Sequence, residues 1–158
     1  TFDSLRRATE EALEAGVTCV DLFGVPLEKD KDASGSVAWN PDGILNRGIA
    51  ALREEFGDDL IIMADTCLDE FTSHGHCGVL DDQGRVLNDE SVQLYQKMAR
   101  SQAEAGAQII SPSGMMDGQV AAIRADLDEA GLRLPAEVAA QAAAAQGAQP
   151  QGLRPPGF

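Results

Sequence analysis

The chain has 158 residues and a formal net charge of −14 at neutral pH. Its length suffices for one domain with a core of its own. The acidic balance disfavours binding to nucleic acid or to an anionic membrane surface, because both need clustered Lys and Arg. We find no apolar run near the roughly 18 residues of a membrane span and no signal peptide pattern at the start. Three cysteines make an odd count, unlike a disulfide framework, so we expect a reducing cytoplasm.

Helical patterns and short apolar runs alternate along the first 131 residues. Helices are predicted over residues 1–15, 40–56, 89–105 and 116–130, and strands over residues 17–23, 60–64 and 107–110. Gly16 and Gly106 each end a helix directly before a strand, and Gly57 ends a helix before the turn Asp58-Asp59 and the next strand. This alternation is typical of an α/β protein with a parallel sheet, whose functional side chains gather after the strands.

Several local features refine these elements. Asp3 or Ser4 is predicted to cap the first helix, and Asn40 and Pro41 are predicted as the N-cap and first residue of the second. The strand over residues 17–23 is mostly apolar, so we expect it to be buried, with Cys19 as a small core side chain. Residues 24–39 form a long polar loop, and a short hairpin is predicted within residues 79–88.

The composition changes after Gly131. Residues 132–158 are rich in Ala, Gln, Pro and Gly and contain two arginines and one glutamate, whereas the acidic residues otherwise lie before this point. A helix within this stretch would have little apolar surface to bury. We therefore divide the chain into an α/β unit over residues 1–131 and a low-complexity tail over residues 132–158 that we expect to be disordered.

Residues 63–80 contain the densest group of metal-capable side chains. The group is Asp65, Cys67, Asp69, Glu70, His74, His76 and Cys77. Cys67 and Cys77 would supply thiolates to Zn²⁺, with Asp69 or His76 as a further ligand. Such a set with an open position favours a catalytic rather than a structural site. The alternative is a polar loop whose histidines form local hydrogen bonds and whose cysteines are inert, or a histidine that contacts substrate.

Two further polar residues follow predicted strands. Asp65 closes the second strand, where its carboxylate would orient a ligand or transfer a proton, or would cap backbone amides of the loop. Ser113 stands in the same relation to the third strand, where its hydroxyl would bind substrate or cap the following helix.

Several strings of the chain resemble those of one enzyme family. Residues 65–78 read DTCLDEFTSHGHCG, and the strings LFGVPLEKD, WNPDGILNR and SPSGMMDGQVAAIRADLDEAG accompany it. Together they resemble porphobilinogen synthase, also called δ-aminolevulinic acid dehydratase, in the same order along residues 1–131. The resemblance implies a (β/α)₈ TIM barrel, of which this chain would contain three βα units (family strands 2–4).

The resemblance also implies a function. Enzymes of this family are lyases that condense two molecules of 5-aminolevulinate into porphobilinogen in haem and tetrapyrrole biosynthesis, usually as homo-octamers. By similarity, Asp65 and Ser113 are active-site residues. The family's zinc ligands would fall on Cys67, Asp69 and Cys77.

The chain departs from the family pattern in two ways. Asp69 replaces a cysteine, so we expect a mixed sulfur and oxygen site for Zn²⁺, with Mg²⁺ as the alternative. The family's two Schiff-base lysines lie in motifs that surround none of Lys29, Lys31 and Lys97. We therefore expect the 158-residue chain to be inactive alone. The alternatives are a non-catalytic metal-binding or interaction module, and an unrelated barrel enzyme that uses a Schiff-base lysine.

Overall fold

The computed structural model describes residues 1–132, in which helices and strands alternate. The elements in chain order are α1 (Phe2–Glu14), β1 (Cys19–Leu22), η1 (Glu28–Asp30), η2 (Ser36–Trp39), α2 (Ile44–Phe56), η3 (Gly57–Asp59), β2 (Ile61–Thr66), α3 (Asn88–Ala105), β3 (Ile109–Pro112) and α4 (Gln119–Glu129). The predicted order of helices and strands is thus confirmed. Apart from Leu132, the predicted disordered tail lies outside the described residues.

The three strands form one parallel sheet in the order β1-β2-β3. Cys19 pairs with Ile61 at the start of the sheet, and Met63 pairs with Ile109 on the other side of β2. Each strand therefore lies beside the strand that precedes or follows it in the sequence. This arrangement confirms the prediction of an α/β protein with a parallel sheet.

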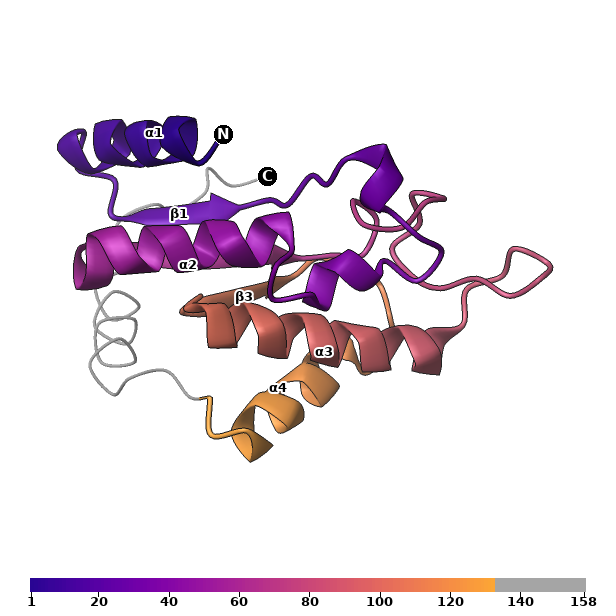
Figure 1. Cartoon of the computed structure of the whole chain (residues 1–158). Coiled ribbons are helices and arrows are strands. Elements are labelled where there is room, and N and C mark those ends of the chain that lie inside the picture. The colour runs from indigo at the N-terminus through magenta and orange to yellow at the C-terminus, as the bar shows by residue number, and fades with distance from the viewer. Residues whose placement is uncertain (133–158) are drawn as a thin grey trace, which may run out of the picture.

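The helices α2, α3 and α4 build the core against one face of the sheet. Ile62 and Ala64 of β2 are fully buried on that face, together with Ile49 and Leu52 of α2 and Met98 of α3. Figure 1 shows α2 and α3 running along the sheet, with α4 packed beside α3. Each fully buried Ile, Leu or Met side chain of this core contributes about 1.5–3 kcal/mol to stability.

The other face of the sheet is more open, and this corrects one prediction. Along β1, exposed and half-buried residues alternate, with Cys19 and Asp21 exposed and Val20 and Leu22 half-buried. Cys19 is therefore not the small core side chain that its apolar neighbours predicted. The physical reason is that the helices cover only the face to which Val20 and Leu22 belong.

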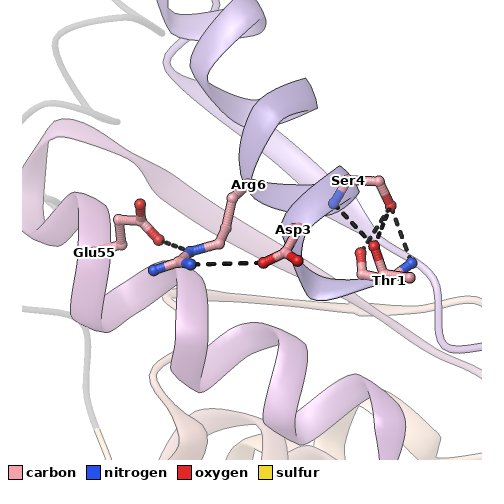
Figure 2. A network of polar contacts seen from close by, with 5 residues as sticks. All are labelled: Thr1, Asp3, Ser4, Arg6 and Glu55. Atoms are coloured by element: carbon pink, nitrogen blue, oxygen red, sulfur yellow. Dashed lines mark hydrogen bonds and ion pairs between the residues drawn. The ribbon is translucent and has the colours of Figure 1, made fainter.

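The first helix begins at a capping box. The backbone N–H of Ser4 donates to Thr1 Oγ1 at 3.2 Å, and the amino group of Thr1 donates to Ser4 Oγ at 3.0 Å. The cap is thus Thr1, and the predicted caps Asp3 and Ser4 lie inside the helix. Figure 2 shows how Arg6 joins Asp3 of the same helix to Glu55 of α2, so that a salt bridge fastens α1 onto α2.

The second helix begins later than predicted. Asn40 and Pro41 precede it in a turn in which Asn40 Oδ1 accepts a hydrogen bond from the N–H of Asp42 at 2.9 Å. The side chain of Asn40 thereby forms an Asx turn instead of a cap, and Gly43 is the N-cap. The predicted glycines at helix ends are confirmed, since Gly57 caps α2 and Gly106 caps α3 in a left-handed conformation.

The remaining boundaries shift by a few residues. The second strand extends to Thr66, so Asp65 belongs to the strand and not to the loop. The third strand begins at Ile109, and α4 begins only at Gln119. Leu80 and Val86 form an antiparallel bridge, which confirms the short hairpin. Within residues 1–132, no helix is both long and apolar enough to cross a membrane.

Candidate active site

The carboxyl ends of β2 and β3 bring two predicted site residues into contact. Ser113 Oγ donates a hydrogen bond to Asp65 Oδ1 at 2.7 Å. The two residues are far apart in sequence, but Asp65 lies opposite Ser111 in the parallel register. Ser113 directly follows β3, so its side chain lies at the edge of the sheet where β2 also ends. In place of the amide-capping and helix-capping alternatives, the structure shows a direct carboxylate–hydroxyl contact.

Asp65 lies in an environment that disfavours its charge. Burial raises the pKa of the carboxyl above its ordinary value, and the negative charges of Asp21, Asp69 and Glu70 raise it further. The hydrogen bond from Ser113 acts in the opposite direction but does not cancel these effects. A buried carboxyl of this kind is suited to hold a proton or to receive one from a ligand.

The buried side-chain amide of Gln102 forms a hydrogen bond with the backbone of Asp65. Gln102 Nε2, on α3, donates to the carbonyl oxygen of Asp65 at 2.8 Å, and Thr66 Oγ1 donates to Gln102 Oε1 at 2.7 Å. Gln102 and Thr66 are fully buried. Sequence reasoning missed both residues. The available signal was a glutamine on the apolar face of a predicted helix, where a polar side chain needs a buried partner.

The predicted metal-binding loop starts with a buried cysteine. The Sγ atom of Cys67 lies 3.6 Å from the hydroxyl of Tyr95, and only 5% of the residue is exposed. Burial raises the pKa of Cys67 to about 11, so the free residue is a neutral thiol. The backbone N–H and the carboxylate of Asp69 both act on this thiol, which places Asp69 beside it.

Cys77 ends the same loop and is half-buried. Its carbonyl oxygen accepts a hydrogen bond from Tyr95 Oη at 2.7 Å, so Tyr95 touches both cysteine residues. Among residues 1–132, no three His, Cys, Asp or Glu side chains are gathered closely enough to hold a metal ion. The structure thus brings Cys67 and Asp69 together but does not assemble them with Cys77 into a finished set of ligands.

The donor types of this loop nevertheless fit a divalent cation. Two thiols and one carboxylate match the mixed sulfur and oxygen preference of Zn²⁺, and Asp69 already lies beside the Cys67 thiol. Metal binding requires deprotonated thiols and releases their protons as the ion enters. A neutral Cys67 in the free protein is therefore compatible with this donor set.

Both histidines hold the loop through local hydrogen bonds. His74 Nδ1 accepts from the backbone N–H of His76 at 3.1 Å, so its ring proton lies on Nε2, which faces the carbonyl oxygen of Ala33 at 3.1 Å. His76 Nδ1 accepts from the N–H of Gly78 at 3.2 Å. These contacts agree with the alternative in which the two histidines form local hydrogen bonds. None of these bonds uses Nε2 of His76.

The loop that follows β1 is joined to the loop that follows β2 through Asp32. Its carboxylate accepts four hydrogen bonds, from the backbone and hydroxyl groups of Ser34 and Ser36. Its backbone carbonyl accepts from the N–H of Ser73 at 2.8 Å, and Asp32 forms a parallel bridge with Thr72. The long polar loop predicted over residues 24–39 is thus ordered around Asp32. The D-x-S-x-S spacing was the missed signal for a structured turn.

The three lysines of the chain all fall within the described residues, and none is on a strand. Lys29 belongs to η1, Lys31 Nζ pairs with Glu28 at 2.7 Å, and Lys97 of α3 lies over the ring of Trp39. Lys31 and Lys97 thus have partners of their own.

Geometry and sequence similarity together define the protein class. The polar residues at the ends of a parallel sheet place the chain among α/β proteins whose functional side chains follow the strands. The chain belongs to the delta-aminolevulinic acid dehydratase family, whose model matches residues 1–145. It is 60% identical over 131 residues to the delta-aminolevulinic acid dehydratases of Mycobacterium leprae (strain TN) and of Mycobacterium tuberculosis (strain ATCC 25618 / H37Rv).

A solved structure shows the same fold. The delta-aminolevulinic acid dehydratase (porphobilinogen synthase) of Toxoplasma gondii ME49, in complex with the reaction product porphobilinogen, superposes with a TM-score of 0.80 at 40% identity. The match covers 83% of this chain and 37% of that one. The chain likewise spans about 40% of the length of the curated relatives that it matches.

Proposed function

We propose that this chain supplies part of the active site of a porphobilinogen synthase. The complete enzyme would condense two molecules of 5-aminolevulinate into porphobilinogen with the loss of two waters. The hydrogen bond between Ser113 and Asp65 carries this proposal, because it joins two family-matched stretches at the ends of neighbouring strands. The 60% identity over 131 residues supports the same reaction for the complete protein.

The sheet is compatible with three consecutive βα units of a TIM barrel, corresponding to family strands 2–4. Its strands follow one another in sequence order, and its helices cover one face. In a barrel the helices form the outer ring, and the opposite face points inward. The open face with Cys19, Asp21 and Asp65 would then line the barrel interior, and β1 and β3 would pair with further strands.

Each site residue has a proposed role. Asp65 orients a ligand or transfers a proton, and Ser113 forms a hydrogen bond with substrate. Cys67, Asp69 and Cys77 would hold a divalent cation, which we propose to be Zn²⁺, with Mg²⁺ as the alternative for a site with a hard oxygen ligand. When bound, such a cation polarises an oxygen of the substrate. Burial of Asp65 and Cys67 keeps water away from their side chains.

The 158-residue chain alone is proposed to form no pyrrole. Covalent catalysis by an amine needs a lysine that faces the substrate, whereas Lys31 pairs with Glu28 and Lys97 lies over Trp39. We treat residues 1–131 as the α/β unit and assign no octamer to this chain by itself. A reducing cytoplasm is the proposed compartment, because all three cysteines are free thiols.

A chimeric enzyme tests the function. Residues 1–131 would replace the matching 131 residues of the Mycobacterium tuberculosis relative, which would supply the remainder of the barrel. We expect this chimera to form porphobilinogen from 5-aminolevulinate. Asp65→Asn should then reduce kcat by about 100-fold or more, whereas Asp59→Asn, on an exposed carboxylate of η3, serves as the matched control with unchanged kcat.

The outcomes separate the alternatives. A folded chimera that lacks activity would contradict the enzymatic proposal, and cation binding by that same chimera would favour a metal-binding module. Pyrrole formation by the purified 158-residue chain would contradict its proposed inactivity. Borohydride trapping of substrate on a lysine of the isolated chain would instead support a different Schiff-base enzyme.

A further inference from the structure

Tyr95 is the feature that connects the parts of the site. It lies on α3, outside the loops that carry the candidate site residues, and it is fully buried. Its hydroxyl donates to the carbonyl oxygen of Cys77 at 2.7 Å and lies 3.6 Å from Sγ of Cys67. One oxygen atom therefore joins the first and the last cysteine of the loop after β2.

The same side chain also borders the loop after β3. A Cβ atom at Gly114 would lie 2.3 Å from Tyr95 Oη and 2.5 Å from its Cζ, so only glycine leaves room for the phenol at this position. Gly114 directly follows Ser113, whose hydroxyl binds Asp65. Tyr95 is thus packed between the loop that contains Ser113 and the loop that contains Cys67 and Cys77, and its position limits how far either loop can move.

From these contacts we infer that Tyr95 is a positioning residue of the cation site, an inference that rests on the proposed function of Cys67, Asp69 and Cys77. Its hydroxyl fixes the direction of the Cys67 thiol and the course of the chain at Cys77. Hydrogen-bond partners of metal ligands set the orientation of those ligands, and their loss typically weakens metal binding by about 10–100-fold. Tyr95 itself contributes no ligand atom.

Tyr95→Phe is the direct test, because it removes the hydroxyl and keeps the ring that fills the space beside Gly114. The matched control is Ser101→Ala on the same helix. Ser101 Oγ accepts a hydrogen bond from Asn46 at 2.9 Å, and Asn46 Nδ2 also donates to the carbonyl oxygens of Ala38 and Asn40. The control thus removes a mostly buried hydroxyl of α3 that does not contact the cysteine loop.

Two measurements on the 158-residue chain report on the hydroxyl. The first is the rate at which iodoacetamide alkylates Cys67 in the metal-free protein, followed by mass spectrometry of the Cys67 peptide. The second is a titration with Co²⁺ alone, a spectroscopic substitute for Zn²⁺, followed by the thiolate-to-cobalt charge-transfer absorption. For Tyr95→Phe we expect an alkylation rate that differs from that of the wild type, because Cys67 loses the hydroxyl that lies 3.6 Å from its Sγ, and a cobalt affinity lower by about 10–100-fold, while Ser101→Ala matches the wild type in both.

Each result decides one question. Equal alkylation rates, or equal cobalt affinities, in the wild type and Tyr95→Phe would overturn the inference. An equal change in Ser101→Ala would also overturn it, because the effect would then be general loosening of α3. If the wild type gives no cobalt–thiolate band, the proposal that Cys67 and Cys77 are cation ligands is wrong. The alkylation rate then still shows whether the hydroxyl holds Cys67, with a changed rate supporting its positioning role and an unchanged rate overturning it.

Discussion

The central strand and the two outer strands of the sheet differ in how completely they are covered. In β2, Ile62 and Ala64 have no exposed surface, and the carbonyl of Asp65 is held by Gln102. In the outer strands, Cys19 of β1 and Ile109 of β3 are exposed. Two of the candidate site residues, Asp65 and Cys67, lie at the end of this well-covered strand and are buried, whereas Ser113 after β3 is exposed. The covered part of the sheet therefore contributes both to stability and to part of the candidate site.

The largest expected effect contrasts two isoleucines of this sheet. Ile62→Ala should lower the free energy of unfolding by about 2–5 kcal/mol, because it leaves a cavity among α2, α3 and β2. Ile109→Ala should cost less than about 1 kcal/mol, because 37% of the residue is already exposed. Urea denaturation of both variants measures the difference, and equal costs would contradict the contrast between central and outer strands.

A pair of glycines sharpens the comparison near the site. Gly114→Ala should destabilise the protein by about 1–3 kcal/mol, because the new methyl group would overlap Tyr95. Gly48→Ala should instead stabilise it by about 0.5–1 kcal/mol, since Gly48 lies inside α2 and an added Cβ would meet only Leu5 at 3.6 Å. Thermal unfolding followed by circular dichroism distinguishes the two signs.

A smaller, pH-dependent effect is expected at Asp32. Burial alone would raise the pKa of this carboxyl, but the hydrogen bonds from Ser36 and Ser34 outweigh burial and hold the pKa well below its ordinary value. The ionised Asp32 carboxylate therefore stabilises the folded protein at pH values above the unfolded-state pKa near 4. This stabilisation is lost as the pH falls below that value toward the folded-state pKa. Asp32→Asn should cost about 1–2 kcal/mol at pH 7, after allowance for solvent screening of this half-buried group.

The measurement for Asp32 is urea denaturation at several pH values. The difference between the wild type and Asp32→Asn should shrink steadily below about pH 4. Asp59→Asn, on an exposed carboxylate, is the control. A difference that stays constant from pH 7 to pH 3 would show that charge on Asp32 is not what holds its loop.

The smallest effect is expected at the surface contact between α1 and α2. Arg6 pairs with Glu55 and Asp3, but about half of its side chain is exposed (48%), and such pairs contribute little. Arg6→Gln should lower the unfolding temperature only slightly, and the difference should vanish in 1 M salt because screening removes the attraction. A larger loss that persists in salt would mean that packing, and not charge, joins these helices.

Sequence reasoning succeeded where one local pattern determines the outcome. Apolar runs after glycine located all three strands, and the rule that functional residues follow parallel strands identified Asp65 and Ser113, which the structure joins. Their catalytic roles and the ligand roles of Cys67, Asp69 and Cys77 stay predictions. The resemblance to the family was confirmed by the comparisons.

The failures share a physical cause, which is dependence on partners distant in the sequence. Cys19 is exposed because of where the helices lie, and no feature of its own strand reveals that. Tyr95 fitted the apolar stripe of its helix, so its hydroxyl contacts with Cys67 and Cys77 were missed. Asn40 is the local exception, since its side chain accepts from the N–H of Asp42 and the cap position falls on Gly43.

The sequence-ordered pairing of the strands has a consequence for how the protein is made. Cys19 pairs with Ile61, and Met63 pairs with Ile109, so β2 docks on β1 and β3 docks on β2, in each case on a strand that left the ribosome earlier. Domains generally fold from their N-terminal part during synthesis. The sheet can therefore grow by one strand at a time as translation proceeds, with each new helix closing over the strand before it.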